Sequence, residues 1–120
     1  LTQNLDRAPT LLDIAGISIP DDMQGESLRK IWQNDVSQWR DAIYYHYYEK
    51  GFGATPHYGL RTDRYKLIHF YDVVDSWEFY DLETDPYEMK NLYADPEYKQ
   101  KIMDLKDRLV ELQEKYKDRI

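Results

Sequence analysis

The sequence contains no cysteine in its 120 residues. Disulfides, thiol catalysis and zinc sites built on thiolates are therefore excluded. It also lacks any run of about 18 apolar residues, so we expect no membrane-spanning helix. The first residues show no basic segment followed by an apolar run, so an export signal is absent from this stretch. Because the chain starts at Leu1, directly before a helix-like segment, we expect it to be a piece of a longer protein.

Clusters of basic residues are also scarce. The chain has 16 Lys and Arg against 23 Asp and Glu, a formal net charge of -7, which argues against broad nucleic-acid binding. Residues 72–90 hold seven acids and one lysine, whereas residues 57–69 hold Arg61, Arg64 and Lys66 against a single aspartate. One side of the domain could therefore attract an anion while another repels it. Ordinary solvated charge is the alternative interpretation.

The opening segment predicts a short helix over residues 6–16, with Asp6 as its N-cap and Gly16 as its C-terminal stop. Apolar residues recur there at spacings of three and four, so we expect one buried stripe made of Leu5, Ala8, Leu12 and Ala15. Residues 18–25 are typical of a loop, and a second short helix is predicted over residues 27–33.

Aromatic and β-branched residues then predict four strands, because such side chains suit a pleated and half-buried surface. Short connections between them favour antiparallel pairing. The third candidate has apolar residues on both faces, which predicts a central strand. The expected strands cover residues 42–49, 58–62, 65–71 and 77–82.

The last element is an amphipathic helix that begins at Asp95 and Pro96, an N-cap and first-turn pair. Its apolar stripe consists of Tyr98, Ile102, Leu105, Leu109, Leu112 and Tyr116. The stripe could be a coiled-coil seam, but it covers only about three heptads, and packing on the chain's own sheet is the better interpretation. The expected fold class is α+β: a small antiparallel sheet of about four strands packed by a long C-terminal helix, with short N-terminal helices.

The three histidines are the first candidates for ligand-binding residues, although no metal-binding motif surrounds them. His57 follows a stretch with glycines and a proline, so a loop could present it to a ligand. His46 alternates with tyrosines, where packing is the ordinary role, and His69 lies in the most apolar strand, which favours a structural role. Arg61 offers a guanidinium suited to sulfate or carboxylate, with pairing to local acids as the alternative.

Two other patterns have ordinary explanations. Asp81, Glu83 and Asp85 look at first like a calcium loop, but the EF-hand glycine is missing and Pro86 breaks the register, so a turn is predicted. The many tyrosines of the strands could stack on sugar rings, although sheet packing is the commoner role.

Four stretches are more specific than their physics requires: NLDRAPTLLDIAG over residues 4–16, MQGESL over 23–28, GLRTDRYKLIHFY over 59–71 and WEFYDLETDPYEMKNLY over 77–93. Together they strongly resemble the C-terminal portion of type I sulfatases of the alkaline phosphatase-like superfamily. Among these, bacterial glucosamine 6-sulfatases and related glycosaminoglycan sulfatases are most similar. The resemblance covers essentially the whole chain and implies the same order of elements as predicted above.

The resemblance implies a parent enzyme that hydrolyses sulfate esters with a formylglycine, made from Cys or Ser in a C/S-x-P-x-R motif, and with a calcium ion. This machinery is missing here. The nearest match, SIPDD at residues 18–22, has an acid where the motif requires arginine, so we reject it as nucleophile. No family calcium-ligand cluster is recognisable, so we expect no cofactor, no metal site and no catalytic residue in this chain.

The resemblance also implies a division into residues 1–38, the end of the large domain with a connecting loop, and residues 39–120, the sheet-and-helix subdomain. Such subdomains close one wall of the substrate pocket, which makes His57 the first choice for contact with a sugar, followed by Arg61 and His46. The implied partners are the N-terminal catalytic domain of the same parent chain and a sulfated saccharide. The implied location is periplasmic or extracellular.

The favoured hypothesis is therefore a noncatalytic C-terminal fragment of a sulfatase that shapes the pocket for a sulfated sugar. An independent carbohydrate-binding or protein-interaction module that uses the tyrosine-rich sheet is the alternative. A third hypothesis, an autonomous enzyme that uses His57 with a carboxylate, lacks an accompanying Ser or Cys nucleophile motif.

Overall fold

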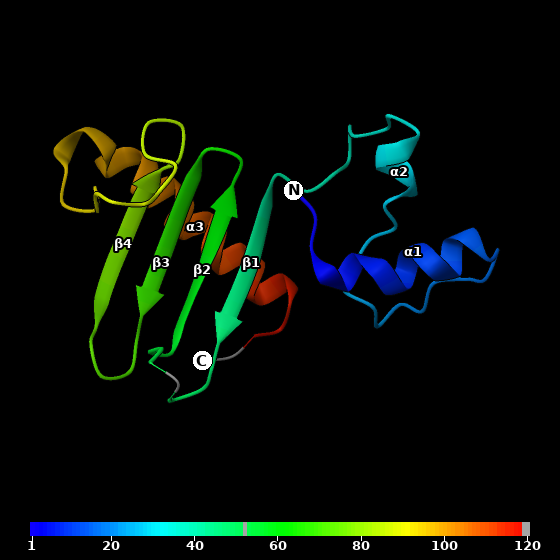
Figure 1. The fold of residues 1–120 in the computed structure, drawn as a ribbon, viewed down its shortest axis with the longest axis horizontal. Coiled ribbons are helices and arrows are strands. Elements are labelled where there is room, and N and C mark those ends of the chain that lie inside the picture. Colours follow the sequence, from blue (N-terminus) through cyan, green and yellow to red (C-terminus); the bar gives the residue numbers. More distant parts are fainter. Residues whose placement is uncertain (52, 119–120) are drawn as a thin grey trace. The chain divides into compact units, whose positions relative to one another are not determined.

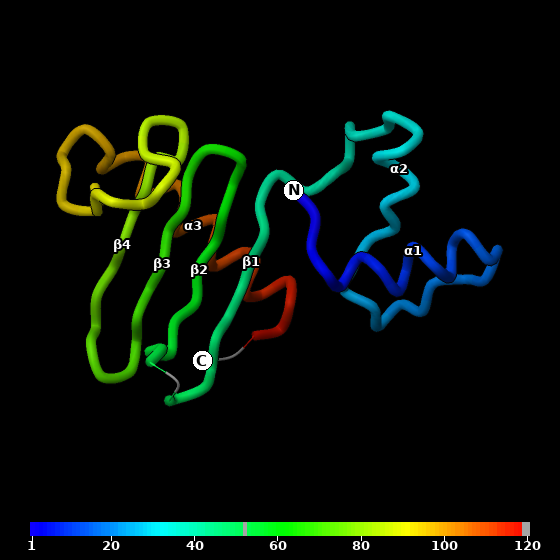
Figure 2. The backbone as a smooth tube through the Cα atoms, viewed as in Figure 1, coloured from blue at the N-terminus to red at the C-terminus, as the bar shows by residue number. Residues whose placement is uncertain are grey.

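The computed structural model describes residues 1–51 and 53–118. The chain divides into two compact units, residues 1–43 and residues 44–120. Figures 1 and 2 follow the backbone through them. The elements in chain order are the 3₁₀ helix η1 (Asn4–Asp6), α1 (Arg7–Ile14), α2 (Arg29–Trp32), β1 (Ala42–Tyr47), β2 (His57–Thr62), β3 (Tyr65–Phe70), β4 (Ser76–Asp81), the 3₁₀ helix η2 (Pro96–Tyr98) and α3 (Lys99–Lys115).

The second unit is built on a sheet of four strands in the order β1-β2-β3-β4. β3 pairs antiparallel with both β2 and β4, so the predicted central position of this strand is confirmed. The β2–β3 turn is held by the Thr62 hydroxyl, which accepts from the Tyr65 amide at 2.8 Å. β1 and β3 end before the predicted residue because their ladder hydrogen bonds end before the aromatic pattern does, whereas β2 begins one residue earlier than predicted and β4 is shifted by one residue.

Helix α3 covers one face of this sheet, as Figure 1 shows. Ile102, Leu105, Leu109 and Leu112 are its buried residues, and opposite them Leu60, Leu67 and Phe79 are fully buried. The predicted stripe and its packing on the sheet are therefore confirmed. The Asp95 carboxylate accepts from the Glu97 amide at 3.0 Å, which confirms the predicted cap, but the first turn is the 3₁₀ helix η2.

The segment between β4 and α3 is fixed by side chains that bond to the edge strand. Asn91 accepts from the Phe79 amide at 3.0 Å and donates to the Trp77 carbonyl at 3.1 Å. Asp81 is fully buried and accepts from the Arg64 Nε and Nη2 atoms at 3.0 and 2.8 Å. The DLETDPYEMKNL stretch is therefore a structural connection that delivers the chain to α3.

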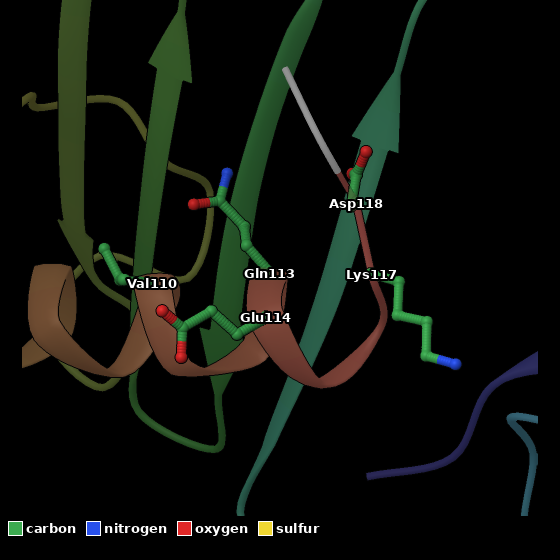
Figure 3. A pocket seen from close by; sticks show the side chains of 5 residues that line it. All are labelled: Val110, Gln113, Glu114, Lys117 and Asp118. Atoms are coloured by element: carbon green, nitrogen blue, oxygen red, sulfur yellow. The ribbon is translucent and has the colours of Figure 1, made fainter.

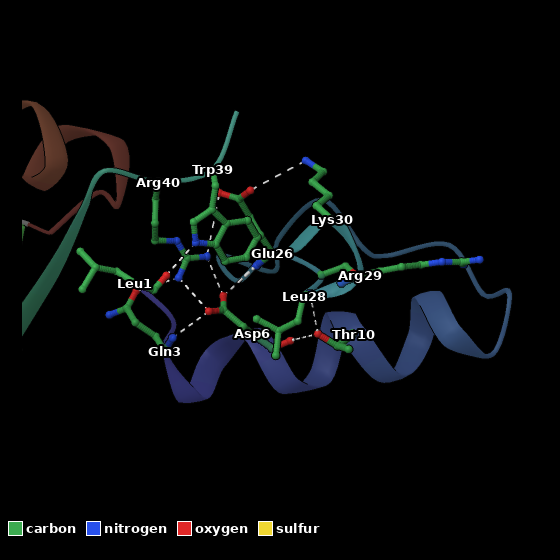
Figure 4. Close-up of polar contacts among 11 residues, drawn as sticks. Leu1, Gln3, Asp6, Thr10, Glu26, Leu28, Arg29, Lys30, Trp39 and Arg40 are labelled. Carbon is green, nitrogen blue, oxygen red and sulfur yellow. Dashed lines mark hydrogen bonds and ion pairs between the residues drawn. The ribbon is translucent and has the colours of Figure 1, made fainter. Parts of the chain in front are cut away.

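In the first unit, a buried ion pair between Asp6 and Arg40 joins the two ends of the segment. The Arg40 guanidinium donates to both carboxylate oxygens of Asp6 at 2.8 and 2.6 Å. Amides of Gln3 and Glu26 also donate to this carboxylate, at 2.8 and 3.0 Å (Figure 4). Burial alone would raise the pKa of Asp6, but the bonds from Arg40 and these two amides outweigh it and hold the pKa below its usual value.

The predicted buried stripe of the first helix is wrong. Leu5, Ala8 and Ala15 are exposed and Leu12 is only half-buried, whereas Asp6, Pro9 and Thr10 are buried. The helix packs through polar contacts: the Thr10 hydroxyl accepts from the Leu28 amide at 3.0 Å and donates to the Asp6 carbonyl. The Asp6 carboxylate accepts hydrogen bonds from Arg40 and from the amides of Gln3 and Glu26, so it does not cap α1 as predicted. The helix itself ends at Ile14, and Gly16 follows with a φ of 72°, as a C-terminal stop requires.

Candidate functional site

Alternation along the strands gives the sheet two distinct faces. We call the face packed against α3 the helix side and the opposite face the open side, because no helix of residues 44–51 and 53–118 lies on it (Figure 1). Leu60 and Leu67 pair across β2 and β3 on the helix side and are fully buried. The alternate positions on β2, which are 57, 59 and 61, therefore point to the open side.

His46, one of the three predicted contact residues, lies on the helix side. Its Nδ1 atom is 2.6 Å from the Asp118 carboxylate and its Nε2 atom is 2.8 Å from the Tyr71 hydroxyl. Only 4% of its side chain is exposed. Both ring nitrogens are therefore occupied within the chain, so the sheet separates His46 from the other two candidates.

The carboxylate that holds His46 also accepts from two tyrosine hydroxyls, Tyr44 at 2.5 Å and Tyr48 at 2.8 Å. Burial alone would raise the pKa of Asp118, but the hydrogen bonds from Tyr44, His46 and Tyr48 outweigh it and keep the pKa below its usual value. This network ties the residues after α3 to β1, so its role is structural.

His57 is the first residue of β2, where its backbone pairs with that of Phe70. The expectation that a loop presents His57 is therefore wrong, because the ladder extends one residue further than the sequence pattern indicated. Three aromatic rings surround the imidazole on the open side. Their centroids lie at 5.6 Å for Tyr47, 6.0 Å for Tyr45 and 5.2 Å for Phe70.

Arg61 lies on the same strand face as His57, with Gly59 between them. Its side chain is exposed and forms no ion pair with any residue in the described ranges. Lys66, its Cα partner on β3, is instead paired with Glu88 at 2.5 Å. The open side therefore presents an imidazole among aromatic rings and an unpaired guanidinium.

Sequence reasoning missed the roles of Gly59 and Phe70 in this cluster. A Cβ atom on Gly59 would lie 2.7 Å from the Tyr45 hydroxyl and against the Leu67 carbonyl oxygen, so the missing side chain is what lets Tyr45 lie across β2. Glycine inside a strand is a recognised signal of such close approach. The Tyr45 hydroxyl is buried and finds no hydrogen-bond partner within the described chain, and burial with nearby Glu88 and Glu78 raises its pKa.

The acidic turn after β4 does not suit a metal. Arg64 donates to both carboxylate oxygens of Asp81, and the Glu83 amide donates to one of them. The Arg64 hydrogen bonds outweigh the cost of burial, so the pKa of Asp81 is lowered. Across the residues that the structure describes, no group of three or more His, Asp or Glu side chains gathers where it could hold a metal ion.

A hollow of about 380 Å³ lies at the C-terminal end of α3 (Figure 3). Two carboxylates and one ammonium line it, so it does not favour an anionic ligand. Its lining residues are Val110, Gln113, Glu114, Lys117 and Asp118. The open side of the sheet, with the exposed guanidinium of Arg61, is therefore better suited to an anionic ligand than this hollow.

Comparison with protein families identifies the chain. The family described as N-sulphoglucosamine sulphohydrolase, C-terminal, matches residues 1–115. Among curated proteins, an N-acetylglucosamine-6-O-sulfatase of Bacteroides thetaiotaomicron is 46% identical over 98% of this chain and 22% of its own length. An arylsulfatase of Clostridium perfringens is 39% identical over 81% of this chain and 19% of its length.

Solved structures agree with this assignment. A protein in complex with its substrate D-glucosamine-2-N,6-O-disulfate has a TM-score of 0.88 and is 47% identical over 94% of this chain and 24% of its own. A 2-O GAG sulfatase has a TM-score of 0.81 and 30% identity over 94% of this chain and 25% of its own. The chain thus spans about a fifth to a quarter of the length of these relatives. No helix within residues 1–51 and 53–118 is long and apolar enough to cross a membrane.

Proposed function

Because this chain belongs to the C-terminal domain family of the N-sulphoglucosamine sulphohydrolases, we propose that it forms one wall of the substrate pocket in a sulfatase acting on sulfated saccharides. The observation that carries the proposal is the open side of the sheet, where His57 and Arg61 share one strand face beside aromatic rings. In this proposal the wall binds and orients the sugar, and the nucleophile belongs to another part of the parent.

The chemistry of the open side suits such a ligand. A guanidinium donates paired hydrogen bonds to sulfate oxygens, and it is always charged. Tyrosine rings offer an apolar face to a sugar ring and a polar tip to its hydroxyls. Arg61 and Tyr47 supply these two groups, and His57 lies stacked on Tyr47 with an interplanar angle of 26°. His46 stays a third predicted contact, but its hydrogen bonds within the chain favour a structural role.

We propose that the calcium ion and the formylglycine of the parent enzyme belong to its N-terminal catalytic domain. There the formylglycine would supply the nucleophile, and a bound calcium ion would supply the positive charge that polarises the sulfate ester. The acidic turn after β4 does not fit calcium, because Arg64 and the Glu83 amide occupy the oxygens of Asp81. No step of the reaction is therefore assigned to residues of this chain beyond binding and orientation.

The same catalytic domain is the proposed partner of the first unit. Exposed apolar side chains lie along α1 and the loop after it. Among them, Leu11 is 67% exposed and Ile14 is 58% exposed. Burying such a surface would stabilise a docked arrangement. We propose accordingly that residues 1–38 complete the large domain and that residues 39–120 form the C-terminal subdomain. Family resemblance further supports a periplasmic or extracellular location, which fractionation of cells expressing the intact protein would test.

Kinetics of the intact sulfatase test the pocket wall. We expect His57→Ala and Arg61→Ala each to lower kcat/KM on D-glucosamine-2-N,6-O-disulfate by about 10-fold or more, the loss typical of one contact to a charged or polar group. Lys99→Ala, an exposed change on α3, is the matched control and should leave kinetics unchanged. Wild-type kinetics for both His57→Ala and Arg61→Ala would remove the open side from the pocket.

A second measurement separates a pocket wall from an independent module. The isolated chain should not bind sulfated oligosaccharides detectably by calorimetry, because most of the pocket is outside it. Binding by the isolated chain with affinity similar to that of the intact enzyme would favour a carbohydrate-binding module. Sulfatase activity of this chain alone with added calcium would contradict the proposal outright.

A further inference from the structure

The ring of His57 has a defined tautomer because of a backbone carbonyl. Its Nδ1 atom lies 2.7 Å from the Thr55 carbonyl oxygen. A carbonyl oxygen can only accept a hydrogen bond, so Nδ1 must carry the proton. In the neutral imidazole the other nitrogen, Nε2, then holds a lone pair and acts as an acceptor.

The free nitrogen distinguishes His57 from the other two histidines. Nε2 of His57 makes no hydrogen bond with any residue of the described chain. His46 uses both nitrogens on Asp118 and Tyr71, and His69 uses both on Tyr58 and Asp75. Within the described chain, His57 is thus the histidine with an unused ring nitrogen.

The position of this nitrogen is also fixed before any ligand arrives. Tyr47 stacks on the imidazole, the edge of Tyr45 meets it at an interplanar angle of 72°, and Phe70 lies 5.2 Å away. With these rings and the Thr55 carbonyl in place, the imidazole cannot rotate without losing contacts. A group held in this way loses little conformational entropy on binding, which is the condition for selective recognition.

We propose that Nε2 of His57 accepts a hydrogen bond from an O–H donor of the bound saccharide, and thereby selects substrates that carry this hydroxyl. Arg61, on the same face, takes the anionic group. The inference rests on the proposed function, because it requires the open side to line the pocket. A bound sugar that lacks the donor would exclude water from this lone pair without giving it a partner, which is how a polar site rejects a close analogue.

The tautomer is testable without substrate. In the ¹⁵N spectrum of the 120-residue chain, His57 should show a protonated Nδ1 and an unprotonated Nε2 at pH values where the ring is neutral. His57→Asn and His57→Gln assign the signals by their disappearance. An Nε2-protonated ring would overturn the inference, because the Thr55 carbonyl would then not fix the tautomer.

The selection is tested in the intact sulfatase with D-glucosamine-2-N,6-O-disulfate and analogues in which one hydroxyl at a time is replaced by hydrogen. His57→Asn can still donate to the Thr55 carbonyl but has no atom at the Nε2 position, whereas His57→Gln places an amide oxygen there. For the wild type we expect one analogue to lose about 10-fold to 100-fold in kcat/KM. His57→Asn should lower kcat/KM on the parent sugar by the same factor, and it should process that analogue as well as the parent sugar. His57→Gln should recover part of the activity on the parent sugar and part of the discrimination against the analogue.

The outcomes separate this inference from the proposed function. Wild-type kinetics for His57→Ala, His57→Asn and His57→Gln would contradict the pocket wall itself. A loss for all three variants, with every deoxy analogue processed as well as the parent sugar, would leave the pocket wall standing and overturn the acceptor role.

Discussion

The Nδ1 atom of His46 on β1 lies 2.6 Å from the Asp118 carboxylate, 72 residues further along the chain. Tyr44 and Tyr48 donate to the same carboxylate, so three side chains of one segment converge on a single acid beyond α3. This relationship fixes the edge strand to the end of the terminal helix, and it makes the stability of the second unit depend on pH.

Replacing Asp118 with Asn should lower the free energy of unfolding by about 1–3 kcal/mol at pH 7, because a charged acceptor is lost. The pKa of Asp118 is lower in the folded state than its usual value of 3.8. The unfolded state therefore binds the proton more readily, so the stabilisation is complete above pH 3.8 and is lost as pH falls through the folded pKa. Urea unfolding of both proteins between pH 7 and pH 2.5 measures this.

The exposed Asp107 on α3 supplies the control, since Asp107→Asn should change stability little at any pH. If the difference between wild type and Asp118→Asn stays constant down to pH 2.5, the carboxylate does not stabilise the network in its charged form.

Lys117→Gly should stabilise the chain by about 1 kcal/mol. Lys117 follows the C-cap of α3 with a φ of 55°, and its amide and that of Asp118 bond back to the Glu114 and Gln113 carbonyls. This is the Schellman arrangement, in which glycine carries no Cβ penalty. Thermal unfolding measures the change. Lys117→Ala removes the same side chain but keeps the Cβ atom, so a gain shared by both variants would rule out backbone strain as its cause.

Gly59→Ala should destabilise the sheet by about 1–3 kcal/mol, the usual cost of overpacking. The new methyl group would meet the Leu67 carbonyl oxygen, which belongs to the β3 backbone and cannot move alone, and would lie 2.7 Å from the Tyr45 hydroxyl. Chemical denaturation of the single variant and of the double variant with Tyr45→Phe measures which contact dominates. We expect no rescue by Tyr45→Phe, and full rescue would assign the clash to the phenol instead.

Arg40→Ala should cost the first unit about 3–5 kcal/mol, because it leaves the Asp6 carboxylate buried without its cation. Arg29→Ala is the matched surface change: Arg29 is half exposed and lies 3.4 Å from Asp13, so its loss should cost at most about 1 kcal/mol. Fluorescence of Trp39, which contacts the Arg40 guanidinium, can follow unfolding. Equal losses of unfolding free energy for the two substitutions would show that the buried Asp6–Arg40 pair stabilises the first unit no more than a surface pair does.

Several features of the fold could be predicted from local sequence. The spacing of Ile102, Leu105, Leu109 and Leu112 is a property of one helix, and the structure buries these residues as predicted. The four strands and the Asp95 cap could likewise be predicted from the sequence, because each depends on neighbouring residues. The stripe predicted for the first helix failed because periodicity cannot show which face of a helix finds a partner, and here a polar face packs on Leu28 through Thr10.

The candidate site was predictable only in part. His57 and Arg61 share a strand face, which their even spacing already indicates once a strand is assigned. The burial of His46 in a hydrogen-bond network depends on Asp118 and Tyr71, which no local pattern connects to it. The role of Gly59 could have been suspected from a glycine inside a strand, but its neighbour Tyr45 comes from another strand.

The sequence by itself determined the elements, their order and the family of this chain, because helical and strand periodicities and motifs are properties of contiguous residues. The tertiary structure alone decided that His57 and His46 lie on opposite faces of the sheet, and that Asp6 meets Arg40. The physical reason is that these outcomes depend on strand register and on the face where α3 docks, which are set by contacts between residues far apart in the chain.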